Sequence, residues 1–156
     1  MNSEELKSAC LEVMEAAEIV YVTTIDQEGY PHTRAMFNLR NKEEFPRQTA
    51  IFAEHQRDFM IYLSTNTSSS KLEHIRANPK VCLYYCHPPT FRGLMLASEI
   101  EIVDSSEVRK ALWNEGWERY YPGGSDDPDH TALRLYPKSV EGWYRGERYE
   151  FRVGHL

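Results

Sequence analysis

The spacing of apolar residues changes along the chain from a helical period to the pattern of strands. Between residues 4 and 18 apolar side chains recur every three or four positions, which predicts an amphipathic helix. Residues 19–25 are rich in β-branched side chains, a polar turn follows at 26–29, and 31–39 resumes an extended pattern. Residues 19–25 and 31–39 are therefore expected to form a β-hairpin.

The rest of the chain continues with short strands and few helices. Helices are predicted from Lys71 to Asn78-Pro79 and from Ser105 or Ser106 to near Gly116, and the charged stretch 40–57 is expected to be a loop with a strand near residues 50–52. The further predicted strands are 59–65, 81–86, 94–103, 132–136, 140–144 and 148–153. Without a repeated parallel βαβ pattern, these elements indicate a mostly β fold, an antiparallel barrel with flanking helices.

Length and charge narrow the possible functions. The 156 residues suit one domain, 1–156, and 41% hydrophobic residues are enough for a core. A net charge of −6 without a basic cluster argues against nucleic acid or an anionic membrane as the partner. No apolar run reaches transmembrane length and no signal peptide is recognisable, so a soluble cytoplasmic protein is expected.

Cysteine usage agrees with a reducing compartment. The chain has three cysteines, an odd number, and reduced thiols are expected rather than a disulfide framework. Cys82 and Cys86, with His87, lie too far apart along a strand to share one ion, so no metal site is predicted.

Residues 65–71 contain the strongest candidate for ligand chemistry. The segment Thr65-Asn66-Thr67-Ser68-Ser69-Ser70-Lys71 joins a predicted strand to a predicted helix. A cation in the first turn opposes the helix dipole, and an anion bound by the free amides, the hydroxyls and Lys71 would resolve this conflict. The alternative is a serine-rich helix cap with a solvated lysine. The segment is no Walker loop, because the required glycines are missing.

Arg34 is the second candidate. It lies on an otherwise apolar strand, and a buried guanidinium needs an anionic partner such as a phosphate. An ion pair with a glutamate is the structural alternative.

Three motifs in order resemble the pyridoxamine 5′-phosphate oxidase-like flavoproteins, the FMN-binding split barrels, and within them the short general stress protein branch. They are Gly29–Met36, Thr65–Lys71 followed by Asn78–Val81, and Leu133–Trp143. The arginine that usually precedes the lysine is Ser70 here, so one phosphate contact is weaker or replaced.

The resemblance implies an antiparallel split β-barrel that binds FMN. It also implies a homodimer with the cofactor sites at the subunit interface, where Ser98, Glu99 and Trp113 are candidate contributions of the second chain and Trp143 lies near the cofactor. The cofactor-binding residues expected in all are Arg34, Ala35, Met36, Phe37, Asn38, Thr65, Asn66, Ser69, Ser70, Lys71, Ser98, Glu99, Trp113 and Trp143.

The C-terminal region departs from the oxidase branch of that family. Its arginine-leucine-histidine-aspartate-arginine substrate motif is missing, and residues 143–151 read Trp-Tyr-Arg-Gly-Glu-Arg-Tyr-Glu-Phe. The expectation is an FMN-dependent oxidoreductase with a small-molecule redox partner that is not a pyridoxamine phosphate oxidase. The alternatives are a non-catalytic flavin-binding stress protein, a haem-binding relative with His55 and His87 as ligands, and a deazaflavin-binding protein.

Overall fold

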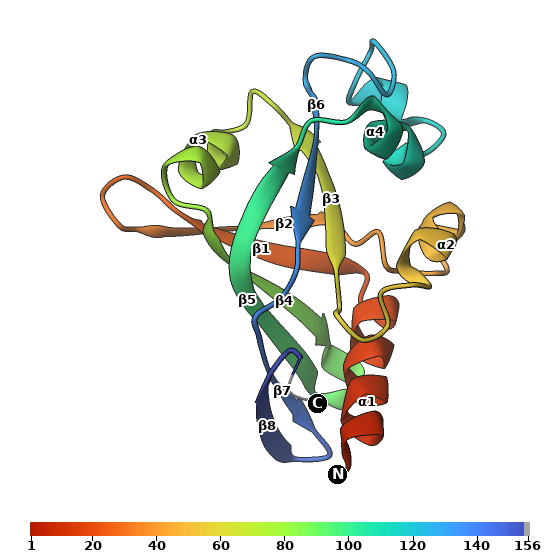
Figure 1. Cartoon of the computed structure of the whole chain (residues 1–156), viewed down its shortest axis with the longest axis vertical. Helices are drawn as coiled ribbons and strands as arrows, with labels where there is room; N and C mark the ends of the chain where they lie inside the picture. Colours follow the sequence, from red (N-terminus) through yellow and green to blue (C-terminus); the bar gives the residue numbers. More distant parts are fainter. Residues whose placement is uncertain (155–156) are drawn as a thin grey trace.

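The strands of the chain form one curled antiparallel sheet (Figure 1). This computed structural model describes residues 1–154. The eight strands are β1 (Ile19–Ile25), β2 (Pro31–Phe37), β3 (Ile61–Asn66), β4 (Lys80–His87), β5 (Arg92–Val103), β6 (His130–Leu135), β7 (Ser139–Tyr144) and β8 (Glu147–Arg152). Every pairing between them is antiparallel, which confirms the predicted mostly β, antiparallel architecture.

The long strand β5 holds the two halves of the sheet together. The strand order is β2-β1-β4-β5-β6-β3. Residues 93–97 of β5 pair with β7, whereas residues 100–103 pair with β6. Because β5 exchanges one partner for another along its length, the twisted sheet curls into a half-barrel and the hairpin β7–β8 continues its lower end (Figure 1).

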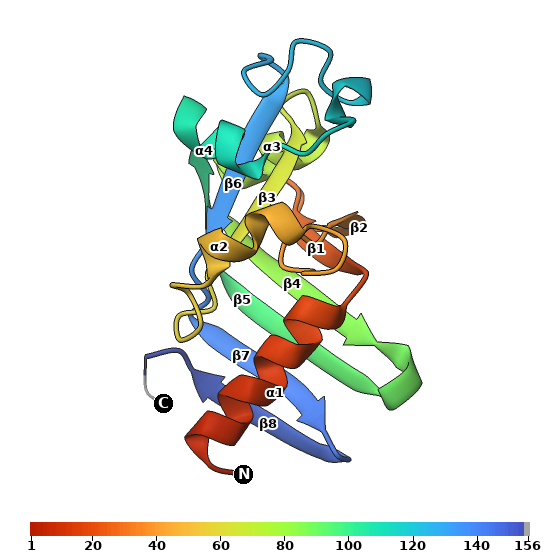
Figure 2. The ribbon, with the colours of Figure 1, turned by 90° about the vertical axis from the view of Figure 1, so that its right-hand side faces the viewer.

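Helix α1 (Ser3–Ala16) closes one face of the sheet. Asn2 caps it, because its side chain accepts a hydrogen bond from the backbone N–H of Glu5 while the Glu5 carboxylate accepts from the backbone of Asn2. Figure 2 shows the helix lying across β4, β5, β7 and β8. Its buried residues Cys10, Val13 and Met14 join the main core. The opposite face of these strands is not covered by α1.

A second core lies on the other side of β3 and β6. The shorter helices are η1 (Pro46–Gln48), α2 (Thr49–Phe52), α3 (Ser70–Ala77), η2 (Pro88–Thr90), α4 (Ser106–Leu112) and η3 (Trp117–Arg119). Side chains from α2, α4, η3 and β6 gather there, with Phe52, Leu112, Trp117 and Ala132 all buried. This cluster fixes the segment between α4 and β6 against the sheet, and that segment borders the site described below.

The region 40–60 differs from the prediction in two places. Residues 50–52 form part of α2 and not a strand, because three apolar residues fit either period and Pro46 starts a helical turn just before them. Strand β3 begins at Ile61 and not at residue 59, because Phe59 is buried with a left-handed φ of 57°, a backbone conformation outside the strand region. Within residues 1–154, no helix is long and apolar enough to cross a membrane.

Candidate functional site

A cavity of about 360 Å³ opens between β2, β3, the start of α3 and the segment after η3. Its size lies within the range of about 300–1,000 Å³ typical of small-molecule and cofactor sites. Six residues expected at the cofactor line it: Ala35, Met36, Phe37, Thr65, Asn66 and Lys71. Two segments that are separated by about thirty positions in the sequence therefore meet at one cavity, whereas Arg34, Asn38, Ser69 and Ser70 do not line it.

Lys71 reaches back from α3 to the end of β3. Its Nζ donates hydrogen bonds to Thr65 Oγ1 and to Ser69 Oγ, both at 2.7 Å. Ser69 is the N-cap of α3 and also accepts from the Lys71 backbone N–H at 3.4 Å. Burial, and then the positive charge of Arg34, lower the pKa of Lys71. The ammonium is thus held by hydroxyls alone, without a neutralising carboxylate in the described chain.

Arg34 is half-buried beside Lys71 and lies on the edge strand β2. Its Nη1 donates to Thr24 Oγ1 at 2.8 Å, to the His32 carbonyl at 3.0 Å and to the Val22 carbonyl at 3.3 Å. Thr24 Oγ1 is in turn 2.8 Å from His74 Nδ1 of α3. The predicted alternative, an ion pair with a glutamate, is not present among residues 1–154. Burial lowers the pKa of this guanidinium.

These two cations disfavour each other, and burial disfavours both. Neither gains a carboxylate from the described chain, so the arrangement is incomplete as a structural ion-pair network. An anion placed between them would relieve both the repulsion and the loss of hydration. The fixed hydroxyls of Thr65 and Ser69 would add to such a site.

The other polar residues of segment 65–71 have distinct positions. Asn66 Nδ2 donates to Asp129 Oδ2 at 2.7 Å, so its amide group is partly committed to the loop before β6. Ser68 N also donates to Asp129, which fastens the turn to that loop. Ser70, which stands where relatives have an arginine, is exposed at the first residue of α3.

The side chain of Asn38 has a structural task. Its Nδ2 donates to the carbonyls of Met14 and Ala17 at 2.7 and 2.8 Å, which caps the C-terminal end of α1. Asn38 is buried and does not line the cavity. Met36 packs partly against the main core, and the ring of Phe37 stacks on Trp117 at 5.7 Å.

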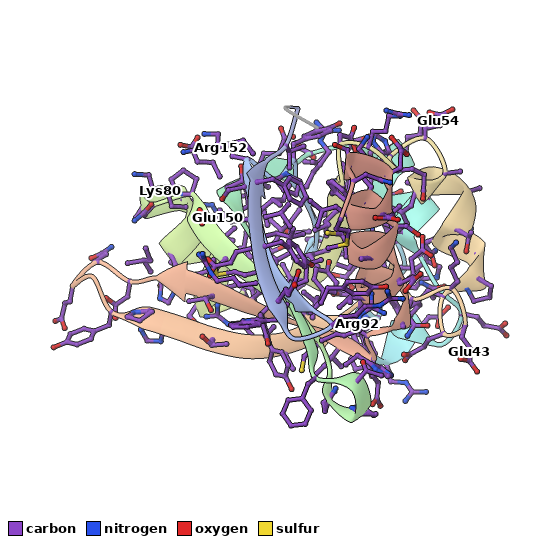
Figure 3. The ribbon with its side chains drawn as sticks, turned by 90° about the horizontal axis from the view of Figure 1, so that it is seen from below. Glu43, Glu54, Lys80, Arg92, Glu150 and Arg152 are labelled. Atoms are coloured by element: carbon purple, nitrogen blue, oxygen red, sulfur yellow. The ribbon has the colours of Figure 1, made fainter. Side chains whose placement is uncertain are left out.

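The residues expected from a second chain lie away from this cavity within one chain. Ser98 and Glu99 line a different cavity together with Lys80 and Arg152, and Figure 3 shows Lys80 and Arg152 on the same side of the molecule. Trp143 is half exposed on β7 and lines a third hollow.

Trp113 packs beside Trp117, Tyr121 and His130 in the aromatic cluster behind the cavity. It does not line the cavity. One chain brings Arg34 and the residues of β2, β3 and α3 together but does not bring Ser98, Glu99, Trp113 or Trp143 to them.

Four lining residues were not predicted: Ile19, Ser64, Tyr120 and Tyr121. Tyr120 and Tyr121 belong to a segment rich in aromatic residues, with Trp113 and Trp117 close before them. The many aromatic residues in this segment could have marked it in the sequence. Only the packing against Phe37 shows that the segment meets β2. Ser64 precedes the recognised Thr65-Asn66 pair and is buried.

The two histidines considered as haem ligands lie elsewhere. His55 Nδ1 is 2.9 Å from Asp58 Oδ2, and His87 Nδ1 is 2.8 Å from Thr90 Oγ1. Neither lines the cavity at Lys71. Among the described residues, no three His, Cys, Asp or Glu side chains gather as metal ligands.

Known proteins resemble this chain over nearly its full length. General stress protein 26 of Bacillus subtilis (strain 168) is 26% identical over 151 residues, which is 95% of each chain. A crystal structure from Clostridium acetobutylicum, of a protein related to general stress protein 26 and described as of the pyridoxinephosphate oxidase family, is 32% identical. It superposes with a TM-score of 0.78 over 97% of each chain.

A more distant neighbour bears on the cofactor. A heme binding protein from Mycobacterium smegmatis shares the fold with a TM-score of 0.63 at 13% identity, over 93% of this chain and 58% of that one. At this identity the likeness concerns the fold alone.

These comparisons agree with the three motifs and with the split-barrel fold that they implied. The similarity to general stress protein 26 also agrees with the short branch of the family. Residues 6–144 match the pyridoxamine 5′-phosphate oxidase family, and this chain therefore belongs to that family.

Proposed function

We propose that this protein binds FMN in the cavity at Lys71, with the phosphate between Lys71 and Arg34. The observation that carries the proposal is this pair of half-buried cations, which are held by hydroxyls and carbonyls and lack a carboxylate partner within residues 1–154. A dianionic phosphate supplies the missing charge. Lys71 lies in the first turn of α3, and the N-terminal end of a helix favours an anion.

Ser70 makes this phosphate site depend on two cations instead of three. Without an arginine before Lys71, the remaining charge comes from Arg34, which the Thr24 and His74 contacts hold in place. We therefore expect each of the two cations to contribute a large part of the affinity for the phosphate group.

We also propose a homodimer in which the second chain completes the pocket. Tyr21, Tyr84 and Met95 lie opposite one another on neighbouring strands, on the face that α1 leaves uncovered. Tyr21 and Tyr84 are 39% and 43% exposed, so an aromatic surface faces outward. Such a surface supports contact with a second copy, which would supply the residues that one chain holds away from its own cavity.

The proposed activity is FMN-dependent oxidation or reduction of a small molecule. When bound, FMN supplies hydride or electron exchange, while the protein orients it and admits a partner. The lining of the cavity contains no carboxylate and no imidazole. The residues of one chain would thus bind and orient the cofactor, and the lining offers the amine of Lys71 and the phenols of Tyr120 and Tyr121 for proton transfer.

Vitamin B6 is not the proposed substrate. Arg148 lies on β8, where Glu141 and Glu150 each neutralise it at 2.9 Å. An arginine committed to two carboxylates is poorly suited to holding a substrate phosphate. The hairpin sequence and its ion pairs both support a substrate other than pyridoxamine phosphate.

The test is the visible spectrum of the purified protein, with titration by FMN and mass identification of any chromophore. About one FMN per chain, bleached anaerobically by NADH or NADPH, would support the oxidoreductase. Tight binding without reduction by common donors would support a non-catalytic flavin-binding protein. A haem band, a deazaflavin, or no binding of FMN would contradict the FMN proposal, and rapid pyridoxal phosphate formation would contradict the proposed substrate class.

A further inference from the structure

His130 is buried at the first residue of β6, behind the wall of the cavity. It is 3% exposed and packs against Tyr121, with ring centroids 4.5 Å apart, and against Trp113 at 5.6 Å. Its Nδ1 lies 2.7 Å from the carbonyl oxygen of Ser125, and its Nε2 lies 3.1 Å from Ser64 Oγ. Both ring nitrogens are therefore engaged.

These two contacts determine which ring nitrogen of His130 carries the proton. A carbonyl oxygen only accepts, so Nδ1 of His130 must carry the proton that it donates to Ser125. Burial lowers the pKa of His130, which favours the neutral ring, and in a neutral ring protonated at Nδ1 the Nε2 atom is an acceptor. The hydroxyl of Ser64 must then donate its own proton to Nε2, which leaves only the lone pairs of Ser64 Oγ for other partners.

Ser64 lines the cavity, two residues along β3 from Asn66. A hydroxyl usually rotates and serves as donor or acceptor as the ligand requires. Here the hydrogen bonds that link the Ser125 carbonyl, His130 and Ser64 leave the Ser64 hydroxyl no freedom to rotate. A ligand in the cavity that meets Ser64 Oγ can therefore only donate to it.

We propose that Ser64, oriented by His130, selects a ligand that carries an N–H donor on the ring edge facing β3. This inference rests on the proposed binding of FMN and names a specificity-determining residue of that site. An oxidised isoalloxazine ring has a single N–H group, at N3, between two carbonyl groups. Ser64 is the acceptor for that group, and His130 is a positioning residue that acts through Ser64.

The experiment compares the binding of FMN with that of 3-methyl-FMN, in which a methyl group replaces the N3 hydrogen. Dissociation constants are measured by flavin fluorescence for the native protein and for the Ser64→Ala and His130→Phe variants. The native protein should prefer FMN by roughly tenfold, the scale of one hydrogen bond plus an unpaired buried group. In Ser64→Ala the preference should fall to about one.

The His130→Phe variant separates positioning from simple packing. Phenylalanine preserves the aromatic surface but frees the Ser64 hydroxyl to rotate, so the preference should fall severalfold although Ser64 is still present. If His130 is purely structural, its replacement should lower the affinity for both flavins equally and leave the ratio of the two dissociation constants unchanged. Circular dichroism and melting temperature confirm that each variant is folded.

The outcomes separate this inference from the proposed function. If the native protein binds neither flavin, the proposed function fails and this inference fails with it. If the native protein binds FMN but binds 3-methyl-FMN equally well, or if Ser64→Ala keeps the native preference, only the role of Ser64 is overturned.

Discussion

The Nζ of Lys71 lies 2.7 Å from Thr65 Oγ1, so a cation at the start of α3 is anchored to the end of β3 before any ligand arrives. Ser69 Oγ holds the same ammonium from the other side of the turn. An immobilised lysine loses less side-chain entropy when it meets an anion than a free one would. The turn thus prepares Lys71 for binding at the expense of its hydration, which is reflected in its lowered pKa.

Replacing Lys71 should weaken the binding of FMN without destabilising the fold. We expect Lys71→Ala to reduce the binding free energy of FMN by about 1.5–3 kcal/mol, the scale of a hydrogen bond to a charged group. The affinity for riboflavin, which has no phosphate, should change little. The melting temperature of the flavin-free protein should stay nearly constant, because the repulsion from Arg34 disappears with the ammonium. Titration calorimetry with both flavins measures the effect.

Lys110 provides the matched control for Lys71. It is an exposed lysine on α4 and does not line the cavity, so Lys110→Ala should bind both flavins as the native protein does. Equal losses for FMN and riboflavin in Lys71→Ala would remove Lys71 from the phosphate site.

Arg34 and Lys71 should be energetically coupled through the phosphate. We expect Arg34→Ala to weaken the binding of FMN. The double variant should lose less binding free energy than the sum of the two single losses, by about 1 kcal/mol. Removing either cation already deprives the phosphate of the joint contact, so removing the second costs less than it would in the native site. Arg34→Ala also loses its contacts with Thr24 and His32, so its folding must be checked by thermal melting. Strict additivity would mean that the two cations do not share one anion.

The strands of this fold were predictable because their patterns are local. Alternation and β-branched residues located β1 and β2 correctly, with the predicted second strand running two residues beyond Phe37, and the 65–71 segment revealed its own cap and cation. The prediction of a strand at residues 50–52 was wrong because the structure of this stretch is not determined by a local pattern. Three apolar residues carry no period, and their state depends on packing against the second core.

The remaining parts of the site depend on contacts between distant segments. Tyr120 and Tyr121 line the cavity because the aromatic cluster around Trp117 packs against Phe37. Ser64 and His130 meet across 66 positions of sequence, because β3 and β6 pair with residue 66 opposite residue 130. The motifs pointed to the charged half of the candidate site, whereas its aromatic half depends on contacts that only the fold shows.

The uncovered face of the sheet should carry the contact between two chains. We expect Tyr84→Glu to convert a dimer into monomers, because a carboxylate in the centre of an apolar contact loses its hydration without gaining a partner. Light scattering after size exclusion measures the mass. The affinity for FMN should fall in parallel, since Ser98, Glu99 and Trp113 are proposed to act across the interface.

Tyr136 provides the control for Tyr84. It is similarly exposed, at 46%, but it follows β6 and lies beside His55. Tyr136→Glu should remain a dimer with native affinity for FMN. A native protein that is already monomeric, or a Tyr84→Glu variant that stays dimeric, would contradict the proposed interface.

His130 should make the fold sensitive to mild acid. Its pKa in the folded protein is lowered from the ordinary 6.5, first by burial and also by the positive charge of Arg109. The hydrogen bond to the Ser125 carbonyl and the charges of Asp127 and Asp126 oppose this shift. The unfolded chain therefore binds a proton more readily than the folded one. The stability that His130 contributes is complete above pH 6.5 and is lost as the pH falls through its lowered folded pKa.

The measurement is the melting temperature between pH 7 and pH 5 for the native protein and His130→Gln. Glutamine keeps a polar side chain but does not titrate, so the variant should lose less stability across this range. The carboxylates with lowered pKa, such as Asp126 and Asp129, titrate at lower pH and are common to both proteins. Parallel melting curves over the whole range would show that folding does not lower the pKa of His130, and would then also remove the support that burial gives to a neutral ring beside Ser64.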